Sequence, residues 1–141
     1  MSVLVDTPIW SLALRRKASK LGPADHALVE EWKALVHAGR AHLSGAIRQE
    51  TLSGIRDTRD FERLREHLAV FDDVPASRED HERAAAFFNA CRTKGVTPTA
   101  IDMLICALAA RHDLAIFTTD RDFTRYAGIL PISLHRRQPR R

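Results

Sequence analysis

The chain has 141 residues, and its 22 Lys and Arg against 18 Asp and Glu give a formal net charge of +4. With 45% hydrophobic and 28% charged residues it has the composition of a globular protein, which excludes a disordered chain. Four arginines lie in the last six residues, and without them residues 1–135 carry no net charge. We expect one domain over residues 1–135 and a basic, flexible tail over 136–141 that attracts anions weakly.

Cysteine and histidine usage argues against a disulfide scaffold and a zinc site. Cys91 and Cys106 each fall in a helical pattern, so we interpret both as core residues. The histidines show no spacing typical of zinc ligands. No apolar run approaches the roughly 20 residues that cross a bilayer, and the charge at Asp6 comes too early for a signal peptide. We expect a soluble, cytoplasmic protein without a membrane partner.

The first half of the chain alternates short apolar runs with amphipathic helices. Pro8 is typical of a first helical turn, and Gly22-Pro23 ends that helix after a basic cluster. The expected elements are a strand at 3–5, a helix from 7 to 20, a helix from 24 to 39, a strand at 42–44, a helix capped by Ser44 that includes residues 47–55, and a helix over 58–70.

The second half continues the alternation and contains the most apolar helix. The expected elements are an edge strand at 73–75, a helix over 77–94, a helix from 101 to 111, a strand at 114–118, a short helix ending at Gly128, and a strand at 129–134. Alternating strands and helices predict a single α/β domain built on a parallel sheet, and the helices outweigh the strands.

Two acidic residues follow strands, where parallel sheets bind ligands. Asp6 follows the run Val3-Leu4-Val5, and Asp120 follows the predicted strand at 114–118. The alternative interpretation is that each side chain caps a helix. Asp102 lies in a helix that is apolar almost all round, where an isolated carboxylate is costly unless it is paired or bound to a cation. Its alternative is a capping box with Thr99.

Glu50 is the fourth acid, and its expected helix face includes Ile47, Thr51 and Gly54, the last leaving room for a close approach. Four carboxylates converging on one pocket would repel one another, and a hard divalent cation would relieve that repulsion. Carboxylate-held Mg²⁺ or Mn²⁺ suits phosphodiester hydrolysis, because the ion activates water and stabilises charge on the phosphate. The residues thus favour an acidic metal pocket.

These acids resemble, in order and spacing, the PIN domain, and specifically VapC-type ribonuclease toxins of type II toxin–antitoxin systems. The resemblance covers nearly the whole chain. The matching pieces are Val3-Leu4-Val5-Asp6-Thr7, Glu50 in Ile47-Arg48-Gln49-Glu50, Gly95-x-x-Pro98-x-x-x-Asp102-x-x-Ile105-x-Ala107, and Thr118-Thr119-Asp120-Arg121-Asp122-Phe123. It implies a three-layer α/β/α domain with a short, mostly parallel central sheet.

The resemblance also implies a metal-dependent endoribonuclease whose Mg²⁺ or Mn²⁺ is held by Asp6, Glu50, Asp102 and Asp120. In it, Asp6 and Asp102 are the most direct ligands, Glu50 ligates through water or acts as a base, and Asp122 is an alternative to Asp120. Thr7 would orient the metal or the scissile phosphate, although Pro8 replaces a frequent second Ser. The implied partners are structured RNA such as tRNA or rRNA, a VapB-type antitoxin that blocks the pocket, and a second copy in a homodimer.

Several neighbouring residues have two interpretations. Arg15, Arg16 and Lys17 are candidates for RNA binding, although charge runs are usually solvated. Arg121 is a candidate for a phosphate contact or an exposed turn residue. Trp10 and Trp32 lie on apolar helical stripes, which favours core packing over stacking on a base or anchoring the antitoxin.

Two alternative functions remain at this point. One is a non-catalytic member of the same fold that binds RNA or a partner, which the intact set of acids argues against. The other is a phosphorylated signalling receiver, for which the required central Asp, Thr or Ser strand and Lys are not evident.

Overall fold

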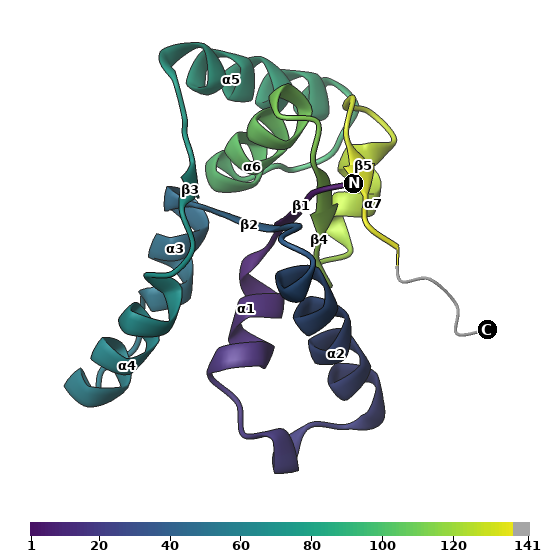
Figure 1. The fold of residues 1–141 in the computed structure, drawn as a ribbon. Helices are drawn as coiled ribbons and strands as arrows, with labels where there is room; N and C mark the ends of the chain where they lie inside the picture. The colour runs from purple at the N-terminus through teal and green to yellow at the C-terminus, as the bar shows by residue number, and fades with distance from the viewer. Residues whose placement is uncertain (137–141) are drawn as a thin grey trace.

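The computed structural model describes residues 1–136, and a parallel sheet of five strands forms the centre of that part (Figure 1). The strands are β1 (Val3–Val5), β2 (Ala41–Ser44), β3 (Asp73–Val74), β4 (Ala115–Phe117) and β5 (Ser133–Leu134). Their spatial order is β3-β2-β1-β4-β5, and every neighbouring pair is parallel. The first strand of the chain therefore lies in the middle of the sheet. Residues 137–141, most of the predicted tail, lie outside the described part.

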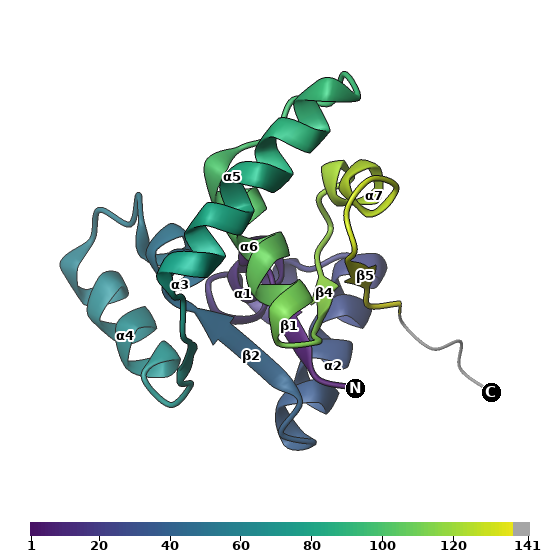
Figure 2. The same ribbon diagram turned by 90° about the horizontal axis from the view of Figure 1, so that it is seen from above.

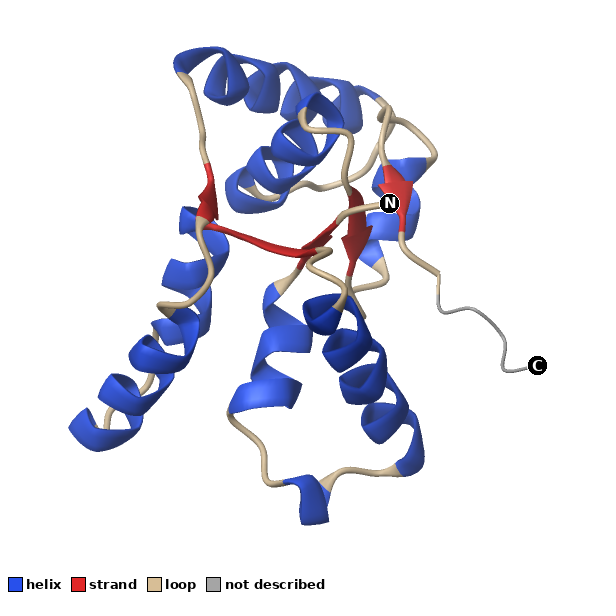
Figure 3. Ribbon diagram, in the orientation of Figure 1, coloured by secondary structure: helices blue, strands red, loops and turns tan. Residues whose placement is uncertain are grey.

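Helices cover both faces of the sheet (Figures 1 and 3). On one side lie α1 (Thr7–Leu14) and α2 (Pro23–His37), and on the other α5 (Arg78–Thr93) and α6 (Ala100–Arg111). Figure 2 shows α3 (Gly45–Leu52) and α4 (Thr58–Leu68) together at the β3 edge, and α7 (Asp122–Ala127) near β5. This arrangement confirms the predicted three-layer α/β/α fold.

The core forms around the central strand. Val3, Leu4 and Val5 are fully buried, as expected for a strand covered on both faces. Trp10 is also fully buried; its indole N–H donates to the carbonyl of Val5 at 2.8 Å, and its ring packs edge-on against Trp32 with centroids 5.6 Å apart. Core packing is thus confirmed for Trp10, and Trp32 is half-buried against it. Cys91 and Cys106 are buried core residues, as predicted.

The helix predicted over residues 7–20 is wrong beyond Leu14. Lys17 is extended, and a separate 3₁₀ turn covers Ala18–Lys20. Residues 15–20 are all exposed, so no burial of side chains stabilises further helical turns. The basic residues Arg15, Arg16 and Lys17 consequently lie on a loop beyond the end of α1.

Two other predicted boundaries are wrong. α3 ends at Leu52, since Ser53 is extended and Gly54 has a φ of +84°, so Gly54 does not share a helix face with Glu50. The strand predicted at 129–134 shortens to Ser133–Leu134 because the N–H groups of Ile129 and Leu130 both bond to the carbonyl of Tyr126. Pro131 has no N–H to donate to a neighbouring strand.

Arg48 fixes the helical hairpin of α3 and α4 to the sheet. Its guanidinium donates to the carbonyls of Leu68 at 3.0 Å and Phe71 at 2.6 Å, where α4 ends. It also donates twice to one carboxylate oxygen of Asp73, at 2.9 and 3.0 Å. One side chain of α3 thus satisfies carbonyls past the end of α4 and an acid of β3.

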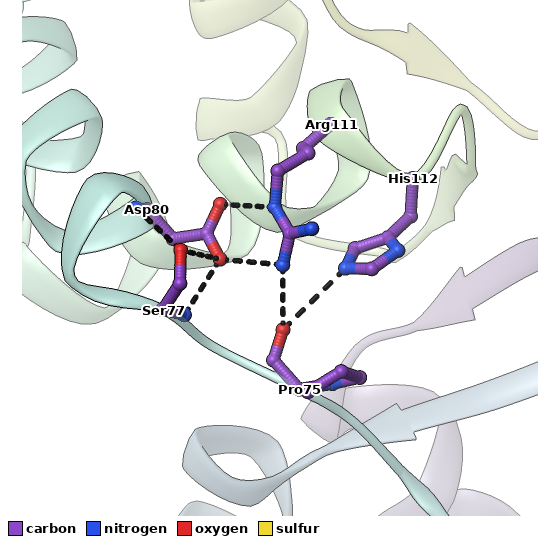
Figure 4. Close-up of polar contacts among 5 residues, drawn as sticks. All are labelled: Pro75, Ser77, Asp80, Arg111 and His112. Atoms are coloured by element: carbon purple, nitrogen blue, oxygen red, sulfur yellow. Dashed lines mark hydrogen bonds and ion pairs between the residues drawn. The ribbon is translucent and has the colours of Figure 1, made fainter.

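A second polar cluster joins α5 to the end of α6 (Figure 4). The buried carboxylate of Asp80 accepts from Arg111 at 2.6 and 2.8 Å, and Arg111 also donates to the carbonyl of Pro75 at 3.0 Å. Asp80 and Ser77 form a reciprocal capping box at the start of α5. The Arg111 guanidinium holds the pKa of Asp80 well below its usual range. The cluster lies at the amino-terminal end of β4 and is structural in character.

Candidate functional site

The carboxyl ends of β1 and β4 meet at the point where the sheet order reverses, the usual place for a ligand in an open α/β sheet. Val5 pairs with Phe117 in register, and the N–H of Asp6 donates to the carbonyl of Phe117 at 2.9 Å. Asp6 is only 4% exposed. Its carboxylate lies at this edge of the sheet, as the sequence predicts.

The side chain of Asp6 is held from β4 and makes no capping bond to α1. Its Oδ2 accepts a hydrogen bond of 2.7 Å from the hydroxyl of Thr118, the residue after β4. The same hydroxyl accepts from the N–H of Asp120 at 3.0 Å. Thr118 therefore connects the first and the last acid of the predicted set, a role that the sequence motif alone did not assign to it.

Asp102 lies in the first turn of α6, and only half of the predicted capping box forms there. The Thr99 hydroxyl accepts from the N–H of Asp102 at 3.1 Å, while the carboxylate of Asp102 accepts from the hydroxyl of Tyr126 at 3.2 Å. Tyr126 is fully buried in α7, and its pKa is raised by burial and by the charge of Asp102. Sequence reasoning missed Tyr126; its signal is the only tyrosine of the chain, close behind the last acid.

Glu50 reaches the site from α3 through Thr7. The Thr7 hydroxyl donates to Oε1 of Glu50 at 3.2 Å, and Thr7 directly follows Asp6. Thr7 thus lies between the two acids, at the start of α1. That this hydroxyl orients a metal or a phosphate stays a prediction.

Asp120 follows β4, and the charges of Asp120 and Asp122 act on different groups. Oδ1 of Asp120 accepts from the N–H of Asp122, the first residue of α7, at 2.9 Å, so the predicted capping interaction is present in part. The charge of Asp120 raises the pKa of both Asp6 and Asp102. The charge of Asp122 contributes to neither of these shifts and acts only on Tyr126.

The acids influence one another's ionisation. Burial is the main cause of the raised pKa of Asp6, and the charges of Glu50 and Asp120 add to it. Burial likewise raises the pKa of Asp102, helped by the charges of Asp6 and Asp120, and that of Glu50, helped by the charge of Asp102. These acids, which come from the ends of β1 and β4 and from α3 and α6, are thus near enough for their charges to act on one another.

The hydrogen-bonded groups at this edge are oxygens, from carboxylates and from the hydroxyls of Thr7, Thr118 and Tyr126. Oxygen donors of this kind are those that Mg²⁺ or Mn²⁺ prefers. Within residues 1–136, no three Asp, Glu, His or Cys side chains already form a complete ligand set. An ion would therefore have to draw the carboxylates closer together.

The basic candidates lie around this edge and not within it. Arg121 is exposed at the start of α7. Arg15, Arg16 and Lys17 are exposed beyond α1, about 12 Å along that helix from Asp6 at its usual rise of about 1.5 Å per residue.

A comparison with protein-family models matches residues 3–129 to the PIN domain. The chain belongs to the PIN domain family. The match spans Asp6, Glu50, Asp102 and Asp120 of this PIN domain. A comparison with curated proteins found no match.

Three solved structures with a similar fold contain FitAB, FitAcB or VapBC2. FitAB bound to the IR36 DNA fragment gives a TM-score of 0.74 at 20% identity, covering 94% of this chain and 93% of that chain. FitAcB from Neisseria gonorrhoeae gives a TM-score of 0.72 at 20% identity, covering 94% of this chain and 96% of that chain. VapBC2 from Rickettsia felis bound to a promoter DNA fragment gives a TM-score of 0.67 at 15% identity, covering 96% of this chain and 98% of that chain. At these identities the likeness concerns the PIN fold.

In the described residues of this PIN domain, no helix is both long and apolar enough to cross a membrane.

Proposed function

We propose that this PIN domain is a Mg²⁺- or Mn²⁺-dependent endoribonuclease that acts as the toxin of a toxin–antitoxin pair. The observation that supports the proposal is the set of hydrogen-bonded acids at the carboxyl edge of the sheet: Thr118 joins Asp6 to Asp120, Thr7 holds Glu50, and Tyr126 holds Asp102. The charges of these acids add to the raised pKa of Asp6, Glu50 and Asp102, and a divalent cation would relieve that repulsion.

Asp6 and Asp102 would hold the ion most directly, because they are the more buried acids and each has a hydroxyl group to orient it. Asp120 is favoured over Asp122 as the fourth acid, since its charge acts on both of them. When bound, the ion supplies an activated water and neutralises charge on the scissile phosphate.

The protein's own residues would then position the reactants and accept a proton from water. Thr118 and Tyr126 donate to the carboxylates and fix their orientation, as second-layer hydrogen bonds do in metal sites. Glu50, the least buried of the three acids with raised pKa values, is the group best placed to take a proton from the attacking water. Thr7 holds Glu50 and is the nearest hydroxyl for the phosphate.

The proposed partners follow from the toxin assignment. The substrate would be a structured RNA such as tRNA or rRNA, with Arg121 contacting a phosphate near the acids. The similar chains come from complexes titled FitAB and VapBC2, which supports a VapB-type antitoxin as the regulator of this protein. A homodimer completes the proposal. We place the activity in the cytoplasm, where such RNA is found.

Cleavage of labelled tRNA and rRNA by the purified protein tests the chemistry. We expect cleavage with Mg²⁺ or Mn²⁺, none with a chelator, and none by the Asp6→Asn or Asp102→Asn variant. Asp72→Asn is the matched control, because Asp72 is exposed just before β3, at the opposite edge of the sheet. Unchanged cleavage by Asp6→Asn would overturn the proposal. If the protein binds RNA but neither cleaves it nor is stabilised by the metal, the result would instead support a non-catalytic binding module.

A further inference from the structure

A cleft of about 530 Å³ separates the end of α1 from α4. The loop residues Arg15, Arg16 and Lys17 line one wall, and Arg63 and His67 of α4 line the other. The chain brings these two walls together from segments about fifty residues apart, so no sequence motif indicates the cleft. Its lining is therefore basic on both sides.

The cleft has little to neutralise its positive charge. Asp60 is the one acid that lines it, and its carboxylate lies 3.9 Å from the guanidinium of Arg63. Both side chains are more than half exposed, at 61% and 69%, so this ion pair contributes little and yields easily to another anion. Among residues 1–136, Arg15, Arg16 and Lys17 form no ion pair at all.

A second hollow lies against α1 and shares one lining residue with the cleft. It has a volume of about 340 Å³, and Pro8, Ser11, Thr119 and Arg16 are among its lining residues. Arg16 lines both hollows. At its other end, Pro8 follows Thr7 and Thr119 precedes Asp120, so this hollow begins beside the acids. Residues next to the acids and Arg16 of the cleft therefore line the same hollow, in which Asp25 is the one acidic lining residue.

We propose that this cleft binds the backbone phosphates of the RNA strand that flanks the cleaved phosphate, with Arg63 and His67 as the wall opposite Arg15, Arg16 and Lys17. The inference rests on the ribonuclease activity proposed above and adds α4 to the RNA-binding surface. The side chains supply positive charge spread over a groove, which matches a polyanion.

The same lining indicates how the RNA is recognised. Apart from the imidazole of His67, no ring lines the cleft, and Trp10 and Trp32 are occupied with each other in the core. Base stacking therefore has little support, and phosphate contacts position a strand without reading its sequence. An acidic protein segment would meet the same cations, and its binding is the alternative outcome of the test below. The hollow that Arg16 shares with residues next to the proposed cleavage site favours RNA.

Binding of a fluorescent single-stranded RNA 20-mer of mixed sequence, measured by anisotropy in a chelator to prevent cleavage, tests the inference. We expect Arg63→Gln to raise the Kd about threefold or more and to reduce the salt dependence of binding by roughly one phosphate contact. Arg59→Gln is the matched control: it removes the same charge from the same helix, but Arg59 does not line the cleft. The double variant Arg15→Gln/Lys17→Gln tests the opposite wall.

The outcomes separate this inference from the ribonuclease proposal. Equal RNA affinity of Arg63→Gln and Arg59→Gln, with the wild type active on RNA, overturns the cleft as a strand-binding site. Loss of binding to an acidic peptide in Arg63→Gln, with RNA binding unchanged, also overturns it and assigns the cleft to a protein partner. Failure of the wild type to cleave any RNA with Mg²⁺ or Mn²⁺ counts against the ribonuclease activity, whatever the anisotropy shows. Circular dichroism of each variant verifies that the fold is retained.

Discussion

The hydroxyl of Thr118 donates a 2.7 Å hydrogen bond to the carboxylate of Asp6, across 112 positions of sequence. These residues follow the two neighbouring central strands β1 and β4, and the bond fixes one carboxylate of the acidic edge from the opposite strand. It also lowers the pKa of Asp6 against the larger raising effect of burial. The pair therefore controls both the direction and the charge of this acid.

Thr118→Val should weaken metal binding and shift its pH dependence. Without the hydroxyl the pKa of Asp6 rises further, so protons compete with the ion up to a higher pH. We expect the pH of half-maximal Mn²⁺ binding, followed by thermal stabilisation at fixed Mn²⁺, to move upward. Thr118→Ser keeps the donor and should behave as the wild type; an equal shift in both variants would contradict this account.

Tyr126→Phe should reduce metal affinity without unfolding the protein. The phenol donates to Asp102 at 3.2 Å, and comparable second-layer bonds change metal affinity by about 10- to 100-fold when lost. The ring, packed edge-on against Phe123 at 5.2 Å, is retained in the variant. Titration with Mn²⁺ should therefore show an affinity lowered by about tenfold, while the unfolding temperature of the metal-free protein moves by only a few degrees. An unchanged affinity would show that the phenol does not orient Asp102.

Asp6→Asn should stabilise the metal-free protein while it abolishes activity. The pKa of Asp6 is raised in the fold, so its charge disfavours the folded state above that pKa, and the neutral amide removes the penalty. A gain of about 1 kcal/mol would raise the unfolding temperature by roughly 2–4 °C for a chain of this size. Calorimetry in chelator measures it, and added Mn²⁺ should stabilise the wild type but not the variant. A large loss of stability in chelator would contradict the repulsion at this edge.

Asp80→Asn should lose a pH-dependent part of the stability. The pKa of Asp80 is depressed by Arg111, so its contribution is complete above the unfolded pKa near 4 and fades as the pH falls below it. At pH 7 we expect the variant to be less stable by about 2 kcal/mol, since a buried charged hydrogen bond is lost. Urea unfolding at pH 7 and pH 3 should show this difference shrinking at the lower pH. A difference that is independent of pH would assign the loss to packing.

Local sequence signals predicted much of the fold. The buried run Val3–Val5, the Pro at the start of α1 and the Ser44 cap predicted their elements, because each depends on adjacent residues. The predicted boundaries were wrong where an element ends for lack of contacts. α1 stops at Leu14 because the exposed residues after it have nothing to pack against. The strand predicted at 129–134 shortened because the carbonyl of Tyr126 captures two of its N–H groups.

In the candidate site, too, the features that depend on adjacent residues were predicted and those that depend on the fold were not. The acids could be named from the sequence, because the ends of the buried strands and one carboxylate in an apolar helix are local features. The hydrogen-bond partners of these acids could not be predicted from the sequence. Thr118 and Tyr126 reach Asp6 and Asp102 through the sheet and the packing of α7, and Arg63 and Arg15 line one cleft although they are far apart in the sequence.

The central position of β1 has a consequence for the timing of folding during synthesis. β1 is the first strand to be synthesised, and it pairs with two other strands. β2 follows early in the chain, but β4, the other neighbour of β1, begins only at Ala115. Until then one side of an apolar strand lacks its partner, which is the kind of non-local pairing that slows folding and exposes a nascent chain to misassociation. A nascent chain that has not yet reached β4 also lacks Thr118 and Asp120, so the acidic edge can form only after these residues have been made.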